Sequence, residues 1–338
     1  MKLSRRSFLA ASAAGVAGAV LPEFTKAASF TDALHAPIAQ SPAAAGGGAK
    51  NQGVKGRPKL CLSTYSLQNF ANEPDGIERV ILAAADIGVE AVDVLHRSMY
   101  TEDNDYIHNI KQMAYMNGVA LACLSIHQDF VDPDPAQRQR MVDHTIRCIE
   151  LAYKMGIPAI RLNSGSWGTA GQGASYRDRV NETPIAGYTN DDGFGWIQEC
   201  IYKCIPTCEQ TGITMALENH WGLSALPEGM WRIKNSVKSR WLKFLLDTGN
   251  FLEEPYDKIA SILPECAFLS CKTYQGGGNW YELDLDYDRI FRMFHEVGFR
   301  GYITLEFEGK ADRMASSIES LSMFKRYIDK YYVDTVIK

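Results

Sequence analysis

The chain has 338 residues, a hydrophobic fraction of 46% and a formal net charge of −5 at pH 7. This length is sufficient for one large domain or two small ones. Because proteins that follow nucleic-acid phosphates carry clustered basic surfaces, the acidic balance excludes nucleic acid as an expected partner.

The first residues carry an export pattern. Arg5 and Arg6 precede an apolar run over residues 8–21 that is rich in Ala and Gly. The run is shorter than the roughly 20 residues of a membrane-spanning helix. It resembles a twin-arginine signal peptide, which we predict over residues 1–28. We therefore expect export to the periplasm or cell envelope in a folded state, with no stable membrane span after signal cleavage.

Residues 29–57 are rich in Ala, Gly and Pro and show little periodicity. Such a composition cannot bury much apolar surface and indicates a flexible linker. The catalytic domain is predicted over residues 58–338.

From residue 59 onward, short apolar runs alternate with longer amphipathic ones. The near-continuous apolar runs are typical of strands that are buried on both faces of a parallel sheet. The predicted strands are 60–63, 91–95, 120–126, 159–162, 214–218, 243–246, 267–272 and 302–306.

Helical patterns lie between these strands, and several end at a glycine. They are 76–87 before Gly88, 106–117 before Gly118, 136–155 before Gly156, 194–211 before Gly212 and 289–297 before Gly298. Glycine is the preferred residue just past a helix C-terminus. Strands joined by helices run parallel, and eight of them favour a closed barrel. The sequence therefore predicts an α/β protein, a single-domain (β/α)8 TIM barrel.

One connection departs from this alternation of strands and helices. Residues 163–193 contain six glycines and no clear helix start. Long loops of this kind are usually functional, and one that follows the fourth strand would cover the carboxyl-terminal mouth. We interpret the segment as a lid or substrate wall that includes Trp167. A surface excursion without a role is the alternative.

The eight cysteines include no CxxC pair, which argues against a zinc ribbon. Cys200, Cys204 and Cys208 recur every four residues and so share one helical face. Core packing is favoured for them over a metal or a disulfide.

Polar residues follow the strands at their carboxyl ends, where TIM barrels place their catalytic groups. Glu218, Asp247 and Glu306 would converge in one mouth and repel one another. A divalent metal such as Mn, Mg, Co or Zn would resolve that repulsion while a carboxylate moves a proton. Ordinary ion pairing is the alternative. The substrate-binding candidates around the mouth are His96, His127, Asn163, Trp167, Asn219, His220 and Glu308.

Three stretches carry a family resemblance: residues 216–220 (ALENH), 245–250 (LLDTGN) and 301–306 (GYITLE). In this order they resemble the xylose isomerase-like barrel family of sugar phosphate isomerases and epimerases, over about residues 58–332. The resemblance implies one divalent metal held by Glu218, Asp247, a strand-seven histidine and Glu306. It also implies that Glu218 and Glu306 act as the acid and base.

The departure from the family is on strand seven. Ser270 stands where the family usually has histidine, while Lys272 matches the family lysine. His220, Ser270 or water could complete the metal site. Alternatively no metal is present, and Lys272 supplies the positive charge as a catalytic residue.

Three functions stay open. The first is an exported isomerase or epimerase that performs metal-assisted proton transfer on a non-phosphorylated sugar or keto-sugar. The second is a 3-keto-glycoside lyase or hydratase, and the third is a non-catalytic carbohydrate-binding barrel. A metal-dependent nuclease is excluded because few histidines lie at strand ends. Homo-oligomerisation is left open.

Overall fold

The computed structural model describes residues 56–332. The predicted signal peptide (1–28) and almost all of the predicted linker (29–57) lie outside these described residues. Within residues 56–332, no helix combines the length and the apolar character that crossing a bilayer requires.

The strands close into a barrel in the order β1 to β8, and every neighbouring pair is parallel. This confirms the predicted TIM barrel. The strands are β1 Lys59–Ser63, β2 Ala91–Leu95, β3 Ala120–Ser125, β4 Ala159–Leu162, β5 Thr214–Glu218, β6 Leu242–Asp247, β7 Cys266–Thr273 and β8 Tyr302–Phe307.

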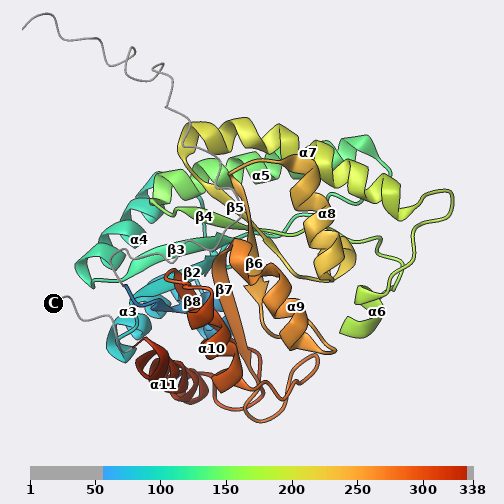
Figure 1. Ribbon diagram of the computed structural model, residues 1–338. Coiled ribbons are helices and arrows are strands. Elements are labelled where there is room, and N and C mark those ends of the chain that lie inside the picture. The colour runs from blue at the N-terminus through green and yellow to red at the C-terminus, as the bar shows by residue number, and fades with distance from the viewer. Residues whose placement is uncertain (1–55, 333–338) are drawn as a thin grey trace, which may run out of the picture. The chain divides into compact units, whose positions relative to one another are not determined.

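Helices surround the barrel, one principal helix following each strand (Figure 1). They are α3 Gly76–Ile87, α4 Asn104–Met116, α5 Pro135–Met155, α7 Asn190–Thr211, α8 Pro227–Val237, α9 Pro255–Ile262, α10 Tyr287–Glu296 and α11 Arg313–Tyr331. Short helices α2 Gln68–Ala71 and α6 Tyr176–Val180 lie in the connections. The C-terminal glycines behave as predicted: Gly88, Gly156 and Gly212 are left-handed and donate their N–H groups to the last helical carbonyls.

The prediction that residues 163–193 contain no clear helix start was wrong. Helix α7 begins at Asn190 because Thr189 and Asp192 form a capping box, in which each side chain accepts from the other's backbone N–H. A second capping box, Ser175 with Asp178, starts the short helix α6 within this segment.

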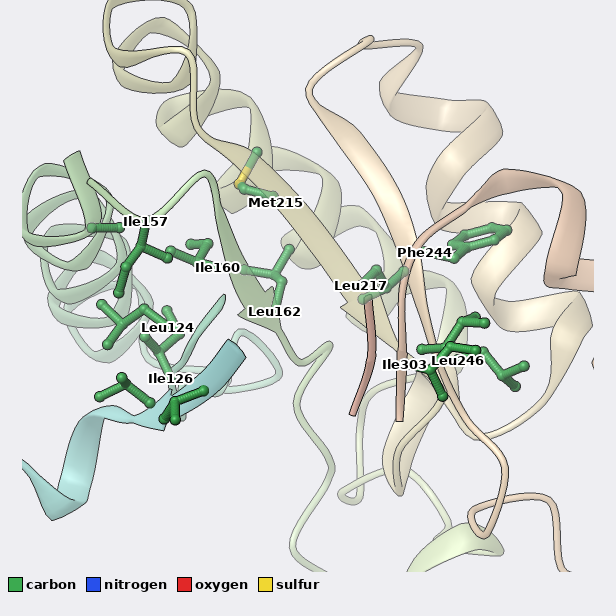
Figure 2. Packing of buried hydrophobic residues seen from close by; sticks show 14 of the residues in the cluster. Leu124, Ile126, Ile157, Ile160, Leu162, Met215, Leu217, Phe244, Leu246 and Ile303 are labelled. Atoms are coloured by element: carbon green, nitrogen blue, oxygen red, sulfur yellow. The ribbon is translucent and has the colours of Figure 1, made fainter. Parts of the chain in front are cut away.

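Two apolar layers hold the barrel together because side chains alternate across each strand. The larger layer packs between the strands and the helices; Figure 2 shows Ile160, Leu162 and Leu217 in this layer. The smaller layer consists mainly of small side chains from six of the strands: Cys61, Ala91, Ala122, Cys123, Ala216, Leu245 and Phe268. Because this layer is small, polar side chains nearer the carboxyl ends of the strands fill the rest of the barrel interior.

The cysteine prediction is confirmed for α7. Cys200, Cys204 and Cys208 are buried in the outer layer. All eight cysteines are free.

Candidate active site

A cavity of about 230 Å³ lies at the carboxyl-terminal mouth of the barrel. Its walls combine strand ends with the connections that follow them. They comprise Ser63, Tyr65, Asp93, Leu95, Arg97, His127, Arg161, Ala174, Tyr176, Arg179, His220, Trp221, Lys272, Trp280, Tyr281, Glu306 and Glu308. Five of the residues singled out from the sequence line it: His127, His220, Lys272, Glu306 and Glu308.

Lys272 of β7 lies at the centre of the acidic groups. Its Nζ is 3.4 Å from Asp247 Oδ2, 3.5 Å from Glu306 Oε1 and 3.2 Å from Glu308 Oε2. Parallel pairing brings Lys272 next to Glu306, because the two residues are in register on the neighbouring strands β7 and β8. One ammonium thus contacts carboxylates that follow two different strands.

Two neutral groups fix the direction of this ammonium. Lys272 Nζ donates to Asn250 Oδ1 (2.9 Å) and to the Tyr281 hydroxyl (3.1 Å), and that hydroxyl donates to the same Asn250 oxygen (2.8 Å). Neither Asn250 nor Tyr281 was singled out from the sequence. Asn250 closes the LLDTGN stretch, so its position next to Asp247 was a usable signal.

Burial and charge act in opposite directions on these groups. Burial alone lowers the pKa of Lys272, but Asp247, Tyr281, Glu308 and Glu306 together raise that pKa well above its ordinary value. Burial raises the pKa of Asp247 and of Glu308, and Lys272 opposes both increases. The ammonium therefore stays charged beside carboxyl groups that hold protons more readily than exposed ones, which suits proton transfer.

Arg161 of β4 provides a second buried cation. Its Nε is 3.6 Å from Glu218 Oε2, and its Nη2 is 3.0 Å from His127 Nε2. Asn163 Nδ2 donates to the same Glu218 oxygen at 3.0 Å. Arg161 was not identified from the sequence, although a charged residue inside a strand buried on both faces must have a buried partner.

Asp93 of β2 was missed for the same reason. Its carboxylate accepts from Ser63 Oγ (3.0 Å) and from Ser125 Oγ (2.7 Å) on the two neighbouring strands. Burial raises the pKa of Asp93 to about 6, while these hydrogen bonds and Arg161 oppose the increase. A cavity-lining carboxyl group with this pKa can exchange protons near neutral pH.

Asn219 positions the strand ends. It donates through Nδ2 to the Asp247 carbonyl (2.9 Å) and accepts from the Asp247 N–H through Oδ1 (2.6 Å). This doubly bonded bridge fixes Asp247 relative to Glu218. Asn219 does not line the cavity, so its expected substrate contact stays a prediction.

Three other residues lie away from the cavity wall. Trp167 is buried, donates through Nε1 to Asn190 Oδ1 (2.9 Å) and packs edge-on against Trp196. His96 pairs with Glu102, at 2.8 Å. Ser270 is buried, and its Oγ has no hydrogen-bond partner among the described residues.

Aromatic and basic residues from the connections complete the wall. Tyr176 and Arg179 belong to the long segment that was interpreted as a wall, and both line the cavity. Tyr176 packs against the rings of Tyr281 (4.7 Å between centroids) and Trp221 (5.9 Å). These rings are not at strand ends, so the strand pattern gave no signal for them.

The donor set at the mouth does not suit a divalent metal. Lys272 Nζ already lies between Asp247 and Glu306, and an ammonium there opposes a second cation by charge and by volume. Glu218 Oε2 already forms an ion pair with Arg161 and accepts a hydrogen bond from Asn163. Among the described residues, one group of three His, Cys or acidic side chains has ligand atoms close enough for one metal: His96, His144 and Cys148.

A closed parallel barrel whose carboxyl-terminal mouth gathers buried acids and cations has the arrangement of TIM-barrel enzymes. Residues 81–327 match the xylose isomerase-like TIM barrel family. The match covers more than half of the chain, and the chain belongs to this family. A search of curated proteins gave no match.

Solved structures with the same fold include several sugar epimerases. An L-ribulose 3-epimerase matches with a TM-score of 0.65 and 15% identity, covering 81% of this chain and 95% of that one. A 3-keto-D-glucoside 4-epimerase from E. coli matches with a TM-score of 0.63 and 14% identity, covering 80% and 100%. A D-psicose 3-epimerase from Clostridium cellulolyticum matches with a TM-score of 0.60 and 15% identity, covering 82% and 96%. At these identities the likeness establishes the fold.

Proposed function

We propose that this protein is an isomerase or epimerase that moves a proton at a carbon next to the carbonyl group of a non-phosphorylated sugar or keto-sugar. The contact between Lys272 and Glu306 carries the proposal. It places a cation that can hold an enolate oxygen beside a carboxylate that can take the proton, and both line one cavity.

In the proposed reaction, the Glu306 carboxylate removes the proton from the carbon next to the carbonyl. The electron pair of that C–H bond forms the C=C bond of an enolate, and the negative charge moves to the carbonyl oxygen. The Lys272 ammonium stabilises this charge, and Arg161 contributes from the other side of the cavity.

Return of a proton completes the reaction. Return to the opposite face of the same carbon gives an epimer, and return to the neighbouring carbon of an enediolate gives an isomer. The family resemblance implies Glu218 as the second proton carrier, but Glu218 is buried, contacts Arg161 and Asn163, and does not line the cavity. Asp93 does line the cavity, and burial raises its pKa to about 6, so Asp93 is the group proposed here to supply the returning proton.

The metal that the family resemblance implies is not part of this proposal. The predicted ligands Glu218, Asp247 and Glu306 are engaged by Arg161 and Lys272, and Ser270 offers a hydroxyl in place of an imidazole. No contact in the described structure brings His220 or Ser270 to those carboxylates. Lys272 therefore takes the charge-stabilising role in the proposed mechanism.

The aromatic residues of the cavity wall and the names of the similar solved structures support the proposed substrate class. Tyr176, Trp221 and Tyr281 offer flat rings on which a sugar can lie. The similar structures are named for ketoses and for a 3-keto-glucoside. Export, itself a proposal, favours a substrate without phosphate.

The test is proton exchange in D₂O followed by NMR, with ribulose, psicose, tagatose and 3-keto-glucosides as the panel. Deuterium in a recovered or epimerised sugar supports the proposal, and Glu306→Gln should abolish it while the protein stays folded. Release of the glycosidic group with an unsaturated keto-sugar would identify the lyase alternative. Binding without any exchange or turnover across the panel would leave a carbohydrate-binding barrel and refute the enzyme proposal.

Export by the twin-arginine route is proposed from the sequence alone. Cell fractionation of the full chain and of an Arg5→Lys, Arg6→Lys variant tests it. A wild-type protein that stays in the cytoplasmic fraction would contradict the proposal.

A further inference from the structure

A second group of metal-ligating side chains lies outside the cavity wall. His96 and Glu102 belong to the connection between β2 and α4, while His144 and Cys148 belong to α5. His144 and Cys148 are four residues apart, which places them on one face of the helix. One ligand atom each from His96, His144 and Cys148 lies within 4.8 Å of the other two.

We infer that His96, His144 and Cys148 form a binding site for a transition metal of the Zn²⁺ class, with Glu102 as the fourth ligand. Thiolate, imidazole and carboxylate are the donors that Zn²⁺ takes in tetrahedral sites. Glu102 Oε1 is 2.8 Å from His96 Nε2, but Glu102 is not one of the side chains whose ligand atoms already lie within 4.8 Å of one another, so it would have to move to reach the metal. The site is independent of the proposed function.

The distances are near those of a bound site. Zn²⁺ lies about 2.0–2.3 Å from N and S ligands, so ligand atoms in a tetrahedron are roughly 3.5 Å apart. Cys148 Sγ is 3.8 Å from His144 Nδ1 and 3.7 Å from Nε2. Because the sulfur is equally far from both nitrogens, it faces the ring, and the imidazole must rotate to direct one nitrogen at the metal. The ring centroids of His96 and His144 are 5.4 Å apart, so a small movement of the two rings would bring one nitrogen of each to a shared metal.

The surroundings also match a metal site. Cys148 is buried, whereas the side chain of Glu102 is 37% exposed. The site is therefore anchored on one side and open to metal on the other.

Arg147 competes with the metal. Its Nη2 is 3.1 Å from His144 Nδ1 and its Nε is 3.4 Å from Glu102 Oε2, so it contacts two of the four ligands. Its side chain is 57% exposed and can move into solvent. Removing this cation should therefore tighten metal binding, an effect that a merely structural cluster would not show.

A metal here would join the β2–α4 connection to α5. That connection carries Arg97, which lines the cavity, and α5 follows the strand-three end that carries His127. The site would thereby fix one side of the cavity wall without contacting the substrate.

The test uses the full chain purified without metal and titrated with Co²⁺ alone. We expect one Co²⁺ per chain, with the near-ultraviolet thiolate-to-cobalt band and the visible bands of a tetrahedral site. Cys148→Ser should abolish the thiolate band. Cys266→Ser, which changes another free cysteine, and Asp247→Asn, which changes the barrel mouth, should both retain it. Loss of binding in Asp247→Asn, or a thiolate band that survives Cys148→Ser, would overturn the assignment.

A second variant guards against misfolding of the first. Arg147→Gln alters an exposed side chain and should bind Zn²⁺ roughly tenfold more tightly in competition with a chelator, because a repelling charge has been removed. Unchanged or weaker affinity in Arg147→Gln, or no cobalt binding by the wild-type chain, would refute the site.

Discussion

Replacing Lys272 with methionine tests the electrostatic basis of the site. Methionine keeps an unbranched side chain of similar length but removes the ammonium, leaving Asp247, Glu306 and Glu308 without their shared cation. Removing one partner of a buried ion pair costs about 3–5 kcal/mol of stability. We expect Lys272→Met to lose about 4 kcal/mol of unfolding free energy at pH 8, together with all turnover.

The loss should depend on pH. Without Lys272 the pKa values of Asp247 and Glu308 rise further, because the charge that most strongly opposes the effect of burial on each is removed. A group whose pKa is higher in the folded than in the unfolded state stabilises the fold at low pH, and that stability is lost as pH rises. At pH 5, protonating a carboxyl group of ordinary pKa about 4 costs only about 1.4 kcal/mol. The Lys272→Met deficit should therefore shrink from about 4 kcal/mol to about 1.5 kcal/mol.

Urea unfolding at pH 8 and pH 5 measures both values. Lys330→Met is the matched control, because the Lys330–Asp288 pair is about half exposed on both sides and should contribute no more than about 1 kcal/mol. If Lys272→Met unfolds within 1 kcal/mol of wild type at pH 8, or shows the same deficit at both pH values, the cation is not neutralising the buried acids.

Three further predictions concern other elements. Asp93→Asn should gain stability relative to wild type as pH rises from 4 to 8, by about 3 kcal/mol at most. The pKa of Asp93 is about 6, so over this range a buried charge forms in the wild type and not in the variant. A difference in unfolding free energy between the two proteins that does not change with pH in urea unfolding would contradict this. Trp167→Ala should lower stability by about 3–5 kcal/mol and alter KM little, since Trp167 is buried away from the cavity; an increase in KM at unchanged stability would return Trp167 to the substrate wall. Thr189→Ala should cost about 1 kcal/mol by removing the cap of α7, while Thr189→Ser should restore most of it; thermal unfolding of both variants checks the pair.

The barrel could be predicted because its local signals agree. Each strand is a short apolar run, and Gly88, Gly156 and Gly212 mark helix ends where only a left-handed residue fits. The helices α8 and α9 were not identified, although each begins with proline, at Pro227 and Pro255. Their starts, like the Thr189 capping box, were readable from sequence.

The candidate site was only partly predictable. Glu306, Glu308 and Lys272 could be identified because they lie at or near the carboxyl ends of their strands. Asp93 and Arg161 lie one or two residues before the ends of theirs, on positions that point into the barrel. Their charge within apolar strands was the available signal. The packing of Tyr176 on Tyr281 and Trp221 was not available, because it depends on how two long connections meet in space.

The arrangement of charge explains how this barrel mouth tolerates so many buried acids. Lys272 of β7 contacts carboxylates of β6 and β8, and Arg161 of β4 contacts Glu218 of β5. The two cations therefore flank the neighbouring acids of β5 and β6 around the ring. Each cation also faces the cavity, where a developing enolate would lie. The same two side chains that neutralise the buried acids are thus positioned to stabilise the proposed reaction. Ser270 fits this arrangement, since a small neutral side chain adds no further ligand or charge beside Lys272.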